Sequence, residues 1–146
     1  MAAPPASRYG PPVLPAAPTR PREIGLVRGL LMATMALCLV GAGASIYSLT
    51  REVTAPGVIV TAATVYFAVQ SAAAPAPLAR GSRWAWVWTF ASTLMGMASG
   101  IPVIATGLDW FAMRPYVLAI GLVWTVLYAW LLGALSTRPV RAWVFA

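Results

Sequence analysis

The chain has 146 residues, of which 60% are hydrophobic and only 9% are charged. Soluble domains carry about 25% charged residues, and a soluble fold of this length could not bury so much apolar surface, so the composition excludes a soluble globular domain. The net charge of +7 comes from arginines that flank apolar segments instead of gathering on one polar face, which indicates membrane orientation and not nucleic-acid binding.

Residues 1–28 form a proline- and arginine-rich segment that we predict to be a disordered cytoplasmic tail. Seven of the thirteen prolines lie in its first 22 residues, and the segment has too few large apolar side chains to fold by itself. Its last arginines, Arg20, Arg22 and Arg28, precede the first apolar stretch. They are predicted to fix orientation and are candidates for binding anionic lipid headgroups.

Four uncharged apolar stretches follow, each long enough to cross a bilayer. About 20 helical residues cover a hydrocarbon layer of about 30 Å, and a backbone in lipid must be helical or part of a closed barrel. The alternating polar pattern of a barrel is absent. The predicted spans cover residues 29–50, 57–74, 84–106 and 115–136. The expected fold is therefore an all-α integral membrane protein, an antiparallel bundle of four transmembrane helices over residues 29–137.

The first span contains a small-residue step, Gly41 and Ser45, which is typical of close helix packing. The same region offers an alternative topology. Ala42-Gly43-Ala44 resembles a signal-peptidase site after an apolar run, and cleavage there would leave three spans and an external N-terminus. The long segment before the run, and the apolar residues after it, favour an uncleaved chain.

In the second span, Gln70 is the most polar residue. An amide in lipid seeks a hydrogen bond from a neighbouring helix, so Gln70 is predicted either to make a packing bond or to line a polar path.

The third and fourth spans contain further small residues at four-residue spacing. Ser92, Gly96 and Gly100 share one face of the third span, and Ala129 and Gly133 share one face of the fourth. Small side chains let two helix backbones approach closely. Two interpretations remain open: packing inside one chain, or a docking face for a second copy or a larger complex.

The positions of the arginines predict the orientation. With four spans, eight of the ten arginines fall on one side, and only Arg51 and Arg114 fall on the other. The positive-inside rule assigns the richer side to the cytoplasm. Both termini, including a short basic and aromatic tail at residues 138–146, are therefore expected in the cytoplasm, with the chain in the cell membrane.

The residues needed for common chemistry are missing from the expected spans. The chain has no histidine and one cysteine, and its three acidic residues flank the spans, so neither a metal site, a cofactor site nor a catalytic site is predicted. Four-span multidrug antiporters of similar length rely on a carboxylate in the first span, and residues 29–50 contain none. We predict that the protein is not an enzyme.

The sequence favours a non-catalytic accessory or scaffold subunit that packs against a larger membrane complex or against itself. Its expected partners are the lipid bilayer and other membrane-protein subunits, without nucleic acid. Two alternatives are a phage-type holin or immunity protein, and a small homo-oligomeric transporter or channel. In composition the chain resembles small actinobacterial membrane proteins, because it uses Ala, Gly, Pro and Arg freely and lacks Lys and Asn.

Overall fold

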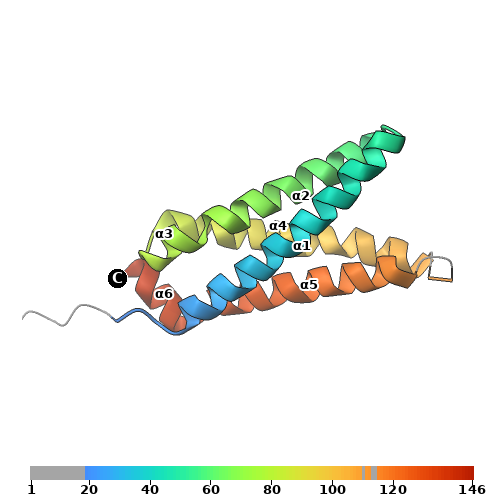
Figure 1. Ribbon diagram of the computed structural model, residues 1–146. Helices are drawn as coiled ribbons and strands as arrows, with labels where there is room; N and C mark the ends of the chain where they lie inside the picture. Colours follow the sequence, from blue (N-terminus) through green and yellow to red (C-terminus); the bar gives the residue numbers. More distant parts are fainter. Residues whose placement is uncertain (1–18, 110, 113–114) are drawn as a thin grey trace, which may run out of the picture.

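The computed structural model describes residues 19–109, 111–112 and 115–146, and the regular secondary structure of these residues is helical throughout (Figure 1). The predicted proline-rich tail falls mostly on residues 1–18, which lie outside the described residues. The helices in chain order are α1 (Glu23–Arg51), α2 (Ala55–Ala73), α3 (Pro75–Ala79), α4 (Arg83–Asp109), α5 (Pro115–Leu135) and α6 (Arg138–Phe145).

Four helical segments are long and apolar enough to cross a membrane, with α2 and α3 taken together as one of them. The predictions of an all-helical fold and of four helices of membrane length are confirmed for the described residues. α1 begins at Glu23, within the segment expected to be a tail. No proline follows Pro21 until the helix has ended, so nothing interrupts the helical hydrogen bonds there.

Proline, threonine and glycine set the ends of the second helical segment. The Thr54 hydroxyl accepts a hydrogen bond from the Gly57 N–H at 3.2 Å, and Pro56 occupies the first turn of α2, where its missing N–H costs nothing. Pro75 opens the short α3. Gly81 then adopts a φ of 74°, a left-handed conformation that favours glycine, and the chain turns into α4.

The long helices form two antiparallel hairpins. α1 packs mainly on α2, and α4 packs mainly on α5, while α1 also contacts α5 and α2 makes a smaller contact with α4. The hairpins meet near α3 and α6 and diverge toward the α1–α2 turn (Figure 1). We call the end that holds the start of α1, the α3–α4 turn and α6 the arginine end. The opposite end, with the α1–α2 and α4–α5 turns, is the open end.

The larger hydrophobic core lies at the arginine end. It joins side chains from α1, from α3 with the residue before it, and from α5. These are Val27, Leu30, Leu31, Ala74, Leu78, Leu131, Ala134 and Leu135. A second, smaller cluster continues toward the middle of the helices and consists of Cys38, Phe67, Ala68 and Tyr128. Because both clusters draw on both hairpins, they hold the hairpins together on this side of the molecule.

The C-terminal segment, residues 138–145, is a helix that closes the arginine end. Val140 and Val144 are buried, while Arg138 and Arg141 are exposed. The Trp143 indole N–H donates to the Leu78 carbonyl at 3.3 Å. The segment expected to be a short basic tail therefore packs against α3 as an amphipathic helix.

Candidate functional site

The predicted small-residue face of α4 lies inside the molecule, against α5 and α2. A Cβ atom added at Gly96 would overlap the Tyr128 ring, and one added at Gly100 would overlap the Thr125 side chain. The Ser92 hydroxyl hydrogen-bonds the Tyr66 hydroxyl of α2 at 3.0 Å. These three residues therefore contribute to packing within one chain.

Two glycines that the sequence interpretation did not single out extend this contact toward the open end. A Cβ atom at Gly107 would lie 2.5 Å from the Cα of Leu118, and one at Gly121 would lie 3.0 Å from the backbone nitrogen of Ile104. The α4–α5 pair thus approaches closely over most of its length. The signal was present in the spacing, since Gly107 follows Gly100 by seven residues and so lies on nearly the same face.

The remaining predicted packing residues divide between the inside and the outside of the molecule. A Cβ at Gly41 would lie 3.4 Å from the Thr64 methyl of α2, and the Ser45 hydroxyl donates to the Gly41 carbonyl at 2.8 Å. Ala129 and Gly133 of α5 are exposed, and nothing lies within 4 Å of a Cβ at Gly133. The structure therefore brings Gly41 against α2, uses the Ser45 hydroxyl within α1, and leaves the α5 pair on the surface.

A second set of small residues lies exposed along α1. Gly25, Gly29 and Gly43 have nothing within 4 Å of an added Cβ, and Ala36 is also exposed. At 100° per residue these four positions fall within about 40° of one another around the helix axis. We call them the α1 glycine face. The sequence interpretation missed this face, although Gly29, Ala36 and Gly43 recur every seven residues.

Among the described residues, Gln70 is one of four buried polar side chains with an atom that has no hydrogen-bond partner. Gln70 is 7% exposed, and its side-chain nitrogen has no hydrogen-bond partner. The hydroxyls of Ser71, Thr89 and Tyr128 are buried and unpartnered as well. A buried polar group without a partner costs about 1–3 kcal/mol, so each of these four groups lowers the stability of the interior.

A mostly apolar cleft of about 510 Å³ separates the two hairpins on the side of the open end. We call Phe67 of α2 and Trp124 of α5 its floor, because Phe67 is the most buried of the lining residues and its ring lies edge to face with the Trp124 ring at 5.8 Å. The Trp124 indole N–H donates to the Gly96 carbonyl at 2.7 Å, which fixes the orientation of the ring. The walls consist of Leu37, Val40, Gly41, Ala44 and Ser45 of α1, Val60, Ala63 and Thr64 of α2, Ser99 and Val103 of α4, and Val117 and Ile120 of α5.

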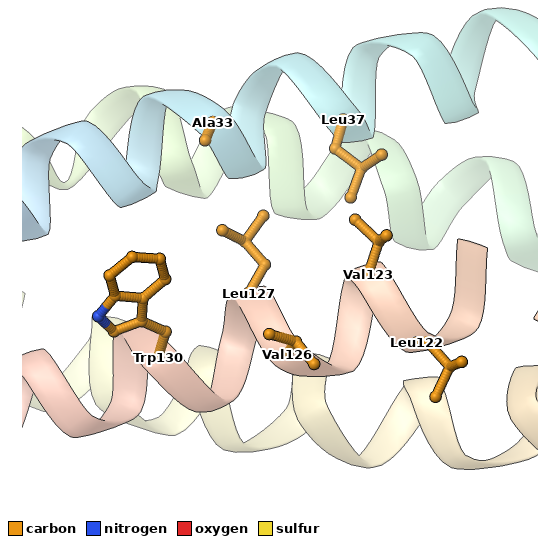
Figure 2. A pocket seen from close by; sticks show the side chains of 7 residues that line it. All are labelled: Ala33, Leu37, Leu122, Val123, Val126, Leu127 and Trp130. Atoms are coloured by element: carbon orange, nitrogen blue, oxygen red, sulfur yellow. The ribbon is translucent and has the colours of Figure 1, made fainter. Parts of the chain in front are cut away.

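A shallower groove runs between α1 and α5 on the outer surface, shown in Figure 2. α1 contributes Ala33 and Leu37, and α5 contributes Leu122, Val123, Val126, Leu127 and Trp130. In Figure 2 the Leu127 and Val123 side chains point toward α1. The groove has no charged lining residue, so the face formed by α1 and α5 suits contact with hydrocarbon or with another apolar helix.

The predicted headgroup-binding residues Arg20, Arg22 and Arg28 are exposed at the arginine end. The same end holds further arginines in the α3–α4 turn and in α6, namely Arg80, Arg83, Arg138 and Arg141. Arg51 lies at the open end, where it donates to the Tyr47 hydroxyl. Arg8 and Arg114 lie outside the described residues. The arginine side chains that are described thus gather strongly at one end of the molecule.

In the described part of the chain, no three His, Cys, Asp or Glu side chains come together as a metal-binding group. The single cysteine, Cys38, is buried in the smaller core cluster.

Comparison with known proteins gives no match, whether with protein-family models, with curated proteins or with solved structures.

Proposed function

We propose that this chain is a non-catalytic integral protein of the cell membrane, with four spans and with the arginine end in the cytoplasm. The support is the arrangement of charge and apolar surface. Large apolar side chains are exposed along every long helix, among them Val40, Val69, Ile101 and Val126 at 62–72%. A surface of this kind is stable in lipid and not in water, and cytoplasmic loops are enriched in arginine.

Cysteine labelling tests the orientation. In a Cys38→Ala background, Val53→Cys lies in the α1–α2 turn and Ala142→Cys lies on the exposed side of α6. We expect a membrane-impermeant maleimide to label Val53→Cys in intact cells, and Ala142→Cys only after the cells are permeabilised. The reverse pattern would overturn the orientation, and a chain that stays dissolved without detergent would overturn membrane insertion.

The uncleaved topology is part of this proposal. Val27, Leu30 and Leu31 of α1 pack with Leu131 of α5 in the larger core cluster. Cleavage after Ala44 would remove these α1 side chains from the core, so we expect mass spectrometry to find α1 intact in the mature protein. A chain that begins at Ser45 would contradict the four-span topology.

Within the membrane, we propose that the protein acts as an accessory or scaffold subunit that packs against another membrane protein or a second copy of itself. The single observation that supports this role is the α1 glycine face. Gly25, Gly29 and Gly43 are open to their surroundings, although glycine destabilises a helix interior by about 0.5–1 kcal/mol relative to alanine. In membranes, such faces let a second helix approach closely and gain dispersion contacts.

Disulfide cross-linking separates the two kinds of partner. Ala36→Cys, at the centre of the α1 glycine face, is introduced in the Cys38→Ala background and oxidised in native membranes. If a second copy occupies the face, we expect a covalent homodimer. If another subunit occupies it, we expect no homodimer, but a protein that co-purifies with the chain and is lost in Gly29→Leu.

Ala91→Leu is the matched control, because Ala91 is an exposed small residue of α4 outside the α1 glycine face. It should leave the association unchanged. A chain that remains monomeric in several mild detergents and in native-lipid discs, without a cross-link or a co-purifying partner, would count against the scaffold role.

Two functional assays address the alternative roles. Regulated expression with a membrane-potential dye tests the holin alternative, for which depolarisation and growth arrest are expected. Flux of neutral solutes into liposomes tests the transporter alternative, for which the unpartnered polar groups around Gln70 would be the expected path. We expect neither depolarisation nor flux from a scaffold subunit.

A further inference from the structure

The cleft at the open end has the dimensions and chemistry of a binding site for hydrocarbon. Its volume of about 510 Å³ falls in the range of about 300–1,000 Å³ that is usual for small-molecule sites. Its walls come from all four long helices, and its floor is the aromatic pair Phe67 and Trp124. It is partly open, so a molecule can enter it from the surroundings of the helices.

The polar atoms in the cleft walls have little to offer a polar ligand. Each lining hydroxyl donates its hydrogen to a carbonyl of its own helix: Ser45 to Gly41 at 2.8 Å, Thr64 to Val60 at 2.9 Å, and Ser99 to Gly96 at 2.7 Å. The Trp124 N–H is also used, since it donates to the Gly96 carbonyl. An occupant of this cleft therefore gains by contact with apolar groups and not by hydrogen bonding.

The size of the cleft argues against a transmembrane helix as the occupant. A helix with its side chains is about 10 Å across, so a volume of 510 Å³ would hold little more than about one helical turn. Water is also a poor occupant, because apolar cavities stay dry. A single flexible hydrocarbon chain is thinner than a helix, needs no hydrogen bonds, and is the most abundant apolar molecule around a protein in a bilayer.

We propose that the cleft binds one acyl chain of a phospholipid from the leaflet at the open end, with the chain terminus against Phe67 and Trp124. Small side chains on the α1–α2 hairpin, Gly41, Ala44 and Ala63, leave the room for it opposite Val103, Val117 and Ile120 of the other hairpin. The bound chain fills the space where the hairpins diverge and keeps them apart. This inference relies on the proposed membrane insertion but not on the proposed scaffold role.

The test measures lipid retained by the purified protein. The chain is extracted in a mild detergent, passed through a delipidating wash and analysed by native mass spectrometry. We expect one phospholipid to remain bound to the wild-type chain. Ala63→Trp and Ala44→Trp fill the cleft, and each should lower the retained lipid about tenfold.

Ala62→Trp is the matched control for Ala63→Trp, because Ala62 is the preceding residue of α2, is exposed and does not line the cleft. It should retain lipid like the wild-type chain. A wild-type chain without retained lipid, or equal retention in Ala62→Trp and Ala63→Trp, would overturn the proposal.

A second measurement does not depend on the folding of the variants. Phospholipids with a diazirine at the end of one acyl chain are irradiated with the wild-type chain in liposomes, and the labelled peptides are identified. We expect labelling at the cleft floor, at Phe67 or Trp124. Labelling confined to outward-facing residues such as Val69 would overturn the proposal, whereas a failure of the scaffold role would appear only in the cross-linking at Ala36→Cys.

Discussion

The two ends of this molecule are formed by the same four long helices, yet different side chains connect the hairpins at each end. At the arginine end, branched apolar side chains such as Leu31 and Leu131 fill the space between the hairpins, and α6 covers them. Toward the open end, the α1–α2 hairpin presents the small residues Gly41, Ala44 and Ala63 to the other hairpin, and a cleft replaces the core. The hairpins join where side chains from both of them meet in one core, and exposed hydrophobic length alone does not bring them together.

Small residues have opposite effects in two parts of the open end. Between α4 and α5, Gly107 and Gly121 allow close backbone contact because the partner helix fills the space they leave. Between the hairpins, Ala44 and Ala63 face an opening that no other helix fills. Small side chains therefore permit close packing but do not enforce it, and the connections of the chain decide which helices approach.

The largest expected effect tests the core at the arginine end. Leu31 is fully buried, and Leu31→Ala would leave a cavity between the hairpins, so we expect the free energy of unfolding to fall by about 2–5 kcal/mol. Leu39→Ala on the same helix is the control, because Leu39 is 56% exposed and should change stability by less than about 0.5 kcal/mol. Unfolding in mixed micelles measures both. Equal losses of stability in Leu31→Ala and Leu39→Ala would mean that the core at the arginine end does not hold the hairpins together.

A smaller effect is expected from the close contact of α4 and α5. Gly107→Ala places a methyl group against the backbone of Leu118, which cannot move aside as a side chain can, and we expect a loss of about 1–3 kcal/mol. Gly43→Ala is the control, since nothing lies near its Cβ, and it should keep or slightly raise the stability of the monomer. A Gly107→Ala protein as stable as Gly43→Ala would show that the two helices are not in contact there.

Helix type, the number of membrane-length helices and the shared face of Ser92, Gly96 and Gly100 could be predicted from the sequence, because hydrophobic length and helical spacing are local properties. The partner of that face could not, since small-residue spacing is the same inside a chain and at an exposed surface. Gly96 packs against Tyr128, whereas Gly133, which has the same kind of spacing, is exposed. Whether a small-residue face is buried inside the chain or exposed depends on how the two hairpins are arranged, which the spacing does not give.

The cleft was not predictable for a related reason. Its walls come from four separate helices, and residues such as Ala63 and Trp124 are far apart in the chain. The C-terminal helix was missed as well, because residues 138–146 are too short and too charged to resemble a span. Val140 and Val144 share one helix face by their spacing, but the surface that buries this face exists only once the arginine end is assembled.

The smallest expected effect concerns Gln70, and the sign of the change in stability separates a structural from a functional role of its side chain. The Gln70 side-chain nitrogen is buried without a partner, so Gln70→Leu removes an unsatisfied group at nearly constant volume. We expect the free energy of unfolding to stay the same or to rise by up to about 1 kcal/mol.

Tyr66→Phe is the contrasting variant from the same helix, because it removes a hydrogen bond that is made and leaves the Ser92 hydroxyl without a partner. It should lower stability by about 0.5–1.5 kcal/mol. If Gln70→Leu instead destabilises the protein as much as Tyr66→Phe does, the Gln70 amide has a partner in the membrane and belongs to the packed core. If stability holds while association or flux changes, Gln70 serves function and not folding.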